Sequence, residues 1–136
     1  MAGYSDTPLL KKLGIKVRYR LLVIGEPKGY WDWISPLPEG TRPGKTNLDF
    51  VHLFVMEKKI YEKELLRLKK LIKPDGMIWV SWPKKSSGVV SDLDENLIRN
   101  FALENGLVDV KVCAVDETWS GLKLVVPIRL RVVRSS

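Results

Sequence analysis

Two short segments hold most of the side chains that could do chemistry. Lys84-Lys85-Ser86-Ser87-Gly88 combines ammonium and hydroxyl groups, and Asp116-Glu117-Thr118-Trp119-Ser120 combines carboxylates, hydroxyls and an indole. Ammonium and hydroxyl groups placed just before a helix could hold an anion together with the free N–H groups of that helix. The carboxylates could accept hydrogen bonds from a ribose or bind a cation, and the indole could stack on a base. The spacing differs from that of a Walker loop, because no Lys-Ser/Thr pair follows Gly88.

Each segment also has an ordinary structural interpretation. The lysine-rich segment could be a solvated loop, and the second segment could be a turn whose Trp119 folds back on the core. In that case Asp116 or Glu117 would pair with Lys84 or Lys85. A carboxylate beside lysines could also perform acid–base catalysis, but only with shifted pKa values. The sequence therefore assigns no catalytic residue.

The counts of cysteine and histidine exclude other kinds of site. The chain has one cysteine, Cys113, and one histidine, His52, which together are too few ligands for a zinc site of these types. A lone cysteine permits no internal disulfide, which suits a reducing compartment. His52 lies in the apolar run Phe50-Val51-His52-Leu53-Phe54, which predicts a half-buried structural histidine rather than a member of a catalytic triad. We expect neither a metal nor a cofactor.

The charge and the hydropathy pattern bound the partners and the location. The net charge is +7, which favours acidic partners such as nucleic acid, nucleotides or anionic lipid. A basic surface without a partner is the alternative interpretation. No apolar run approaches the roughly 20 residues that span a bilayer, and the start of the chain lacks an apolar signal core. We expect a cytoplasmic protein without membrane contact.

Strand and helix patterns alternate along the chain. The predicted strands are 17–24, 48–55, 77–82, 108–114 and 122–133, the predicted helices are 30–34, 57–72 and 92–105, and residues 1–16 form an N-terminal arm. Such alternation is typical of right-handed βαβ units and a parallel sheet. The short turn between the last two strands makes them antiparallel. Pro127 cannot donate to a strand ladder, which predicts that the last strand lies at a sheet edge or carries a bulge.

These patterns predict one α/β domain over residues 1–136, with three layers and a mostly parallel, twisted, Rossmann-like sheet that ends in an antiparallel hairpin. In open α/β sheets, ligands bind beyond the carboxyl ends of the parallel strands. Four segments should follow such ends: Glu26–Trp31, Met56–Lys58, Pro83–Ser87 and Asp116–Ser120. The candidate ligand-binding residues on this rim are Lys28, Trp31, Lys84, Lys85, Ser86, Ser87, Asp116, Glu117, Thr118, Trp119 and Ser120.

Two resemblances to known families follow from longer stretches. Leu68-Lys69-Lys70-Leu71-Ile72-Lys73-Pro74-Asp75-Gly76-Met77-Ile78-Trp79-Val80 resembles the helix–turn–strand of class I methyltransferases, where a Leu-Lys-Pro-Gly-Gly-like turn precedes a buried strand. Nearly the whole chain is similar to a family of small uncharacterised bacterial proteins, a domain of unknown function. The stretches that carry this second resemblance are Gly3–Leu9, Lys12–Ile15, Trp79–Lys85, Ser87-Gly88, Gly106–Asp109 and Lys111–Leu122. It names a family but no activity.

The methyltransferase resemblance implies a Gly-rich turn after the first strand and an acidic residue at the end of the next strand, which holds a ribose. Here that turn is Gly25-Glu26-Pro27-Lys28-Gly29, in which Pro27 cannot donate a backbone N–H. Between Ile24 and Leu48 there is little room for a full helix and strand, so we expect a truncated cofactor half.

The sequence therefore predicts a non-catalytic or cofactor-degenerate methyltransferase-like domain that binds a small anion, a nucleotide or a protein partner at the rim. Two alternatives stay open. One is an enzyme, such as an S-adenosylmethionine-dependent methyltransferase, that uses Asp116 or Glu117 with Lys84 or Lys85. The other is a basic RNA- or DNA-binding module. The sequence leaves the oligomeric state open.

Overall fold

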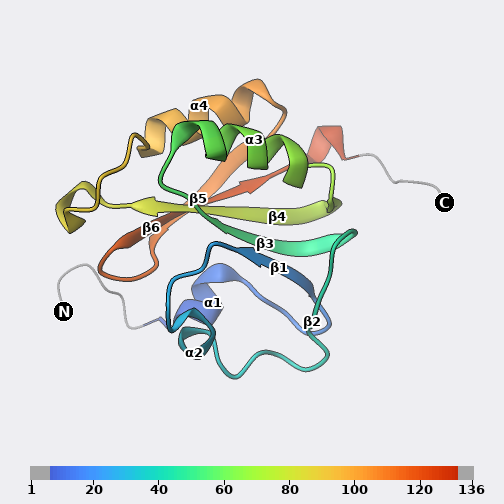
Figure 1. Cartoon of the computed structure of the whole chain (residues 1–136). Coiled ribbons are helices and arrows are strands. Elements are labelled where there is room, and N and C mark those ends of the chain that lie inside the picture. Colours follow the sequence, from blue (N-terminus) through green and yellow to red (C-terminus); the bar gives the residue numbers. More distant parts are fainter. Residues whose placement is uncertain (1–6, 132–136) are drawn as a thin grey trace.

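The computed structural model describes residues 7–131, which are built around a six-stranded sheet with the order β2-β1-β3-β4-β6-β5 (Figure 1). The strands are β1 (Arg20–Ile24), β2 (Arg42–Pro43), β3 (Leu48–Phe54), β4 (Ile72–Pro83), β5 (Val108–Ala114) and β6 (Trp119–Val125). Neighbours from β2 to β4 are parallel, whereas β6 is antiparallel to both β4 and β5. The predicted fold class, mostly parallel with an antiparallel C-terminal hairpin, is confirmed.

Helices cover both faces of the sheet, which gives three layers (Figure 1). The helices are α1 (Leu9–Leu13), α2 (Tyr30–Trp33), α3 (Lys58–Leu68) and α4 (Glu95–Glu104), with short 3₁₀ turns η1 (Lys85–Ser87) and η2 (Ile128–Leu130). α3 and α4 lie on one face, and α1 and α2 lie on the other. Within residues 7–131 no helix is long and apolar enough to cross a bilayer, since α3 has 11 residues.

The alternation of side chains along the central strands divides the core between the two faces. On β3, Val51 and Leu53 pack with the buried face of α3, which includes Tyr61 and Leu65. The intervening residues of β3, from Phe50 to Phe54, face the core shared with α1 and α2. Each fully buried large apolar side chain stabilises the fold by about 1.5–3 kcal/mol. The two helical layers are thus held by one sheet with two apolar faces.

The boundary between α3 and β4 differs from the prediction. α3 ends at Leu68, and β4 begins at Ile72, so Pro74-Asp75-Gly76 lies inside the strand rather than in a turn before it. The register of β4 against β3 shifts at this point, and a Cβ on Gly76 would lie 2.6 Å from the carbonyl oxygen of Leu48. The glycine permits this close approach of two backbones. The Pro-Asp-Gly composition of the segment is typical of a turn, so the sequence alone did not indicate a strand here.

The prediction for the last strand was wrong. β6 ends at Val125, before Pro127, and it lies between β4 and β5 rather than at an edge. Leu122 and Leu124 are buried on it, which suits an interior strand. Pro127 ends the ladder and leads into η2, so Ile128–Leu130 form a separate 3₁₀ turn rather than a continuation of the strand.

Candidate functional site

Lys84 joins the two segments that the sequence places at the rim. Its backbone N–H donates to the carbonyl of Thr118 at 2.8 Å, and its Nζ donates to the carbonyl of Asp116 at 2.9 Å. Pro83 is also the partner of Trp119 in the β4–β6 ladder. The loop after β4 and the turn between β5 and β6 therefore form one unit at the carboxyl end of β4, at the left of Figure 1.

The carboxylate of Asp116 shapes this turn. Its Oδ1 accepts hydrogen bonds from the backbone N–H groups of Thr118 at 2.9 Å and Trp119 at 2.7 Å. The ring of Trp119 packs edge-on against Phe54, with centroids 5.1 Å apart. Among residues 7–131, no ion pair joins Asp116 or Glu117 to a lysine. Trp119 thus packs on the core, as in the structural interpretation of this turn, but Lys84 binds a backbone carbonyl rather than a carboxylate.

The loop after Lys84 carries polar groups, but no α-helix follows it directly. Lys85 and Ser86 are exposed, and the hydroxyl of Ser87 donates to the carbonyl of Lys84 at 2.6 Å. The expectation that this loop leads directly into a helix N-terminus was wrong. α4 begins only at Glu95, and the side chain of Asp94 already accepts the N–H of Leu97.

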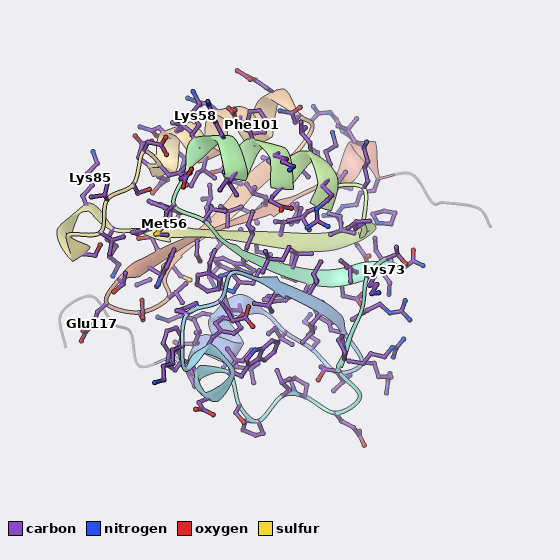
Figure 2. The ribbon with its side chains drawn as sticks, in the orientation of Figure 1. Met56, Lys58, Lys73, Lys85, Phe101 and Glu117 are labelled. Atoms are coloured by element: carbon purple, nitrogen blue, oxygen red, sulfur yellow. The ribbon has the colours of Figure 1, made fainter. Side chains whose placement is uncertain are left out.

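Asp92 lies before α4 in the sequence, but its side chain caps the start of α3. Its Oδ1 accepts the backbone N–H of Lys58 at 2.7 Å, at the start of α3. The hydroxyl of Ser91 donates to the carbonyl of Met56 at 2.8 Å, which fixes the same segment over the end of β3. The chain therefore supplies its own anion to the start of α3. Figure 2 shows Met56 and Lys85 at the same end of the molecule, which is the predicted rim.

The first loop starts beside the end of β3, because a Cβ on Gly25 would lie 2.7 Å from the carbonyl oxygen of Phe54. Lys28 is exposed, and the indole Nε1 of Trp31 donates to Glu26 at 3.0 Å. Among the described residues, no hydrogen bond or ion pair joins Lys28 or Trp31 to the loop after β4 or to the turn after β5. Trp31 instead lines a cavity of about 380 Å³ beside β1 and β2. Hydrogen bonds thus join Lys84–Ser87 to Asp116–Ser120, and Phe54 at the end of β3 packs against Trp119 of the same unit.

A buried polar network lies behind the rim. His52 is fully buried: its Nδ1 lies 2.8 Å from the hydroxyl of Tyr30, and its Nε2 lies 2.8 Å from the Oγ of Ser81. Burial lowers the pKa of His52 to about 3 and raises the pKa of Tyr30. The sequence predicted a half-buried histidine and missed this network, because the three residues come together only through the sheet and α2. Both ring nitrogens are engaged, so the imidazole serves the core rather than a reaction at the surface.

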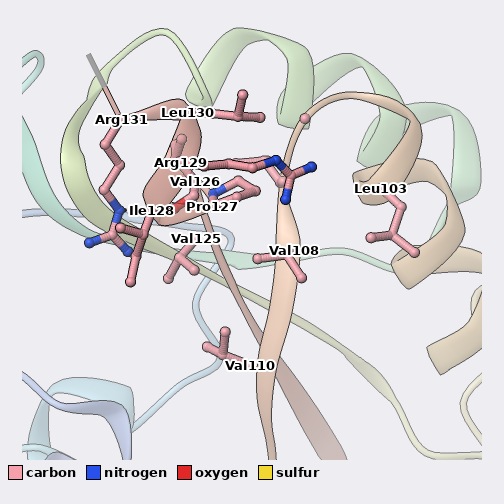
Figure 3. Close-up of a pocket in the computed structure, with 12 residues that line it drawn as sticks. Leu103, Val108, Val110, Val125, Val126, Pro127, Ile128, Arg129, Leu130 and Arg131 are labelled. Carbon is pink, nitrogen blue, oxygen red and sulfur yellow. Dashed lines mark hydrogen bonds between the residues drawn. The ribbon is translucent and has the colours of Figure 1, made fainter.

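A second cavity, of about 660 Å³, lies at the opposite end of the sheet (Figure 3). Residues from the end of β6, the start of β5 and η2 line it. The sequence pattern does not indicate this cavity, because residues 122–133 alternate like one continuous strand, whereas β6 ends at Val125 and η2 follows.

The strand order, the antiparallel hairpin and the helices on both faces define a Rossmann-like α/β fold of the class I methyltransferase type. The chain is similar to the structure titled a DhpI–SAH complex, with a TM-score of 0.60, 12% identity and coverage of 86% of this chain and 81% of that one. A SAM-dependent methyltransferase from Aquifex aeolicus gives a TM-score of 0.56 and 13% identity, covering 85% of this chain and 86% of the other. Fibrillarin from Aeropyrum pernix, in complex with natively bound S-adenosyl-L-methionine, gives a TM-score of 0.56 and 13% identity over 90% of this chain and 70% of that chain. At these identities the likeness concerns the fold.

No family model matches the chain, and no curated protein matches it significantly.

The residues of the first loop do not fit S-adenosylmethionine, the cofactor named for two of these proteins. Pro27 has no N–H to offer a ligand, its carbonyl accepts the N–H of Tyr30, and the helix that follows has only four residues. β2 has two residues, Arg42 and Pro43, and the chain then continues through Gly44 and Lys45 without an acidic side chain. A dinucleotide-type site needs backbone donors at a helix start and an acidic residue near the end of the second strand. Here the helix after the first loop is a single turn preceded by Pro27, and no acidic residue follows β2 before β3 begins at Leu48.

Proposed function

We propose that this chain is a methyltransferase-like domain without methyl-transfer activity, which binds a small anionic ligand at the rim formed by Lys84–Ser87 and Asp116–Ser120. The observation that carries the proposal is the double attachment of Lys84 to the carbonyls of Thr118 and Asp116. It fixes a loop with an exposed ammonium group, Lys85, and an exposed hydroxyl group, Ser86, at the edge where open α/β sheets bind ligands.

Binding is favoured over catalysis because the titratable groups of this unit have structural partners. Asp116 accepts two backbone N–H groups, and the ammonium of Lys84 donates to a carbonyl. Transfer of a proton by either group would break the turn that holds the loop. His52 is fully buried, with both nitrogens engaged. The poor fit of the first loop to S-adenosylmethionine supports the same conclusion.

The charge of the ligand follows from the groups that remain available. Lys85 is an exposed cation beside exposed Ser86, and the chain as a whole carries a net charge of +7. A positive field raises the local concentration of anions and their rate of association. A phosphate or diphosphate group is the ligand chemistry that an ammonium and a hydroxyl together recognise.

Calorimetric titration of the full chain with pyrophosphate tests the proposal. We expect saturable binding that Lys85→Ala weakens about tenfold, which corresponds to the loss of about 1.4 kcal/mol. Lys63→Ala is the matched control, because Lys63 is an exposed lysine on α3 and its loss removes the same charge elsewhere. Equal weakening by both variants would show attraction by net charge alone and would overturn the proposal, as would the absence of binding.

A further inference from the structure

The cavity of about 660 Å³ at the far end of the sheet has an unusual lining (Figure 3). The lining residues are Leu103, Gly106, Leu107, Val108, Val110, Val125, Val126, Pro127, Ile128, Arg129, Leu130 and Arg131. Every one of them is apolar, a glycine or proline, or an arginine, and none is acidic. The volume lies within the roughly 300–1,000 Å³ of small-molecule sites, which are mostly apolar with a few polar groups.

Large apolar side chains stand exposed around this cavity. Ile128 is 80% exposed, Val110 53% and Leu103 51%. They come from η2, β5 and α4, so three separate elements contribute to one apolar surface. Contiguous apolar surface on a folded chain is typical of a binding site. Burial of these groups against an apolar ligand would favour binding, because it removes apolar surface from water.

The two arginines define the charge of the ligand. The Nε of Arg131 donates to the carbonyl of Val126 at 2.9 Å, which places its guanidinium beside the cavity. In Figure 3 the side chain of Arg129 points from η2 toward the side of the pocket where Val108 and Leu103 are drawn. Among the described residues, neither arginine forms an ion pair. The planar guanidinium matches a carboxylate in a two-point hydrogen bond.

We propose that this cavity binds a small amphiphilic carboxylate, in which an alkyl or aryl body fills the apolar part and the carboxylate meets Arg129 and Arg131. The complementarity of charge and polarity carries the choice: an inorganic anion would leave the apolar wall uncovered, and an uncharged apolar molecule would leave both arginines unmatched. The site is separate from the rim, because Val108 and Val125 pair at the end of the hairpin remote from the Asp116–Ser120 turn.

A second copy of the chain is the other occupant that the surface suggests. β5 is an edge strand, yet its pairing with β6 is irregular between Asp109 and Lys111, and Lys111 is exposed on it. Bulges and lysines on edge strands oppose pairing with another edge. The structure therefore favours the small ligand, and the oligomeric state becomes an outcome of the test.

The test is calorimetric titration of the full chain with sodium decanoate below its micelle-forming concentration. Decan-1-ol and acetate serve as comparison ligands that lack the charge and the apolar body, respectively. We expect decanoate to bind at least tenfold more tightly than either. Arg129→Gln should weaken decanoate binding about tenfold and leave decanol unchanged, and Ile128→Ser should weaken both. Lys63→Gln is the control for the loss of one positive charge.

Three results would overturn the proposal: no saturable binding of decanoate, equal affinity for decanoate and decanol, or equal weakening by Arg129→Gln and Lys63→Gln. A dimer in sedimentation that Ile128→Ser dissociates, without decanoate binding, would assign the surface to a second copy instead. The Lys85→Ala variant separates this proposal from the rim function. It should retain full decanoate affinity, so either proposal can fail alone.

Discussion

His52 on β3 and Ser81 on β4 are diagonal neighbours in the sheet, with the imidazole Nε2 2.8 Å from the serine Oγ. The other ring nitrogen lies 2.8 Å from the hydroxyl of Tyr30, and the ring of Phe54 stacks on the imidazole at 4.2 Å between centroids. A polar group buried in an apolar core is tolerated only when it is hydrogen-bonded. The network therefore ties the α2 layer to the two central strands, in the core behind the rim.

The stability of the fold should fall on mild acidification because of His52. Burial lowers the pKa of His52 to about 3 in the folded state, whereas the unfolded chain titrates near 6.5. Between these two values the unfolded state binds the additional proton, so the free energy of unfolding decreases as the pH falls. The slope from this group approaches about 1.4 kcal/mol per pH unit. Urea unfolding measured from pH 7 to pH 4 checks it.

The His52→Gln variant isolates this contribution, since other groups titrate equally in both proteins. The difference in stability between the native chain and the variant should shrink as the pH falls. A difference that stays constant with pH would contradict a neutral, buried His52.

The hydroxyl of Tyr30 should stabilise the fold through the same histidine. Tyr30→Phe leaves the Nδ1 of His52 without its partner in a buried site, which costs about 1–3 kcal/mol. Tyr19→Phe is the matched control, because Tyr19 is only half-buried and its hydroxyl forms no side-chain hydrogen bond within residues 7–131; its effect should stay within about 0.5 kcal/mol. Equal effects of the two variants on urea unfolding would argue against the network.

The first loop should depend on the absence of a side chain at Gly25. Its φ is 71°, and a Cβ would lie 2.7 Å from the carbonyl oxygen of Phe54. Gly88 has a φ of 79° with nothing within 4 Å, so Gly88→Ala measures the backbone strain alone, about 1 kcal/mol. Gly25→Ala should cost more than Gly88→Ala in thermal unfolding. The reverse order would contradict the close approach of β1 and β3 at the rim.

Lys123 should destabilise the β5–β6 hairpin. It lies directly opposite Lys111, and burial together with the charges of Lys111 and Lys16 lowers the pKa of Lys123. Like charges across a strand pair are unfavourable, and opposite charges contribute about 0.2–1 kcal/mol. Lys123→Glu should therefore raise the melting temperature at low salt, and added salt should reduce the gain. A melting temperature that falls at low salt would refute this account of the pair.

The sequence predicted the fold class because its signals are local and periodic. The β-branched runs and the stripe of α3 mark buried strands and an amphipathic helix, and the short connection between β5 and β6 requires them to be antiparallel. The sequence did not predict that Asp92 caps α3 or that β6 ends before Pro127. Both features depend on tertiary contacts rather than on the local pattern. The topology predicted that Lys84 and Asp116 lie close together, since both follow parallel strands. It did not predict that the Nζ of Lys84 donates to the backbone carbonyl of Asp116. The His52 network and the Arg129 cavity each join residues that are remote in sequence, so no local sequence pattern predicts either of them.

The proposed function requires an anion-binding rim at residues 84–87 and 116–119 and no S-adenosylmethionine site at residues 25–29. The most direct measurement follows the backbone amide signals of ¹⁵N-labelled full-length chain during titration with pyrophosphate and, separately, with S-adenosylmethionine. Pyrophosphate should shift the amides of residues 84–87 and 116–119, and S-adenosylmethionine should leave those of residues 25–29 unchanged. Saturable shifts at residues 25–29 with S-adenosylmethionine, or no shifts at residues 84–87 with pyrophosphate, would contradict it.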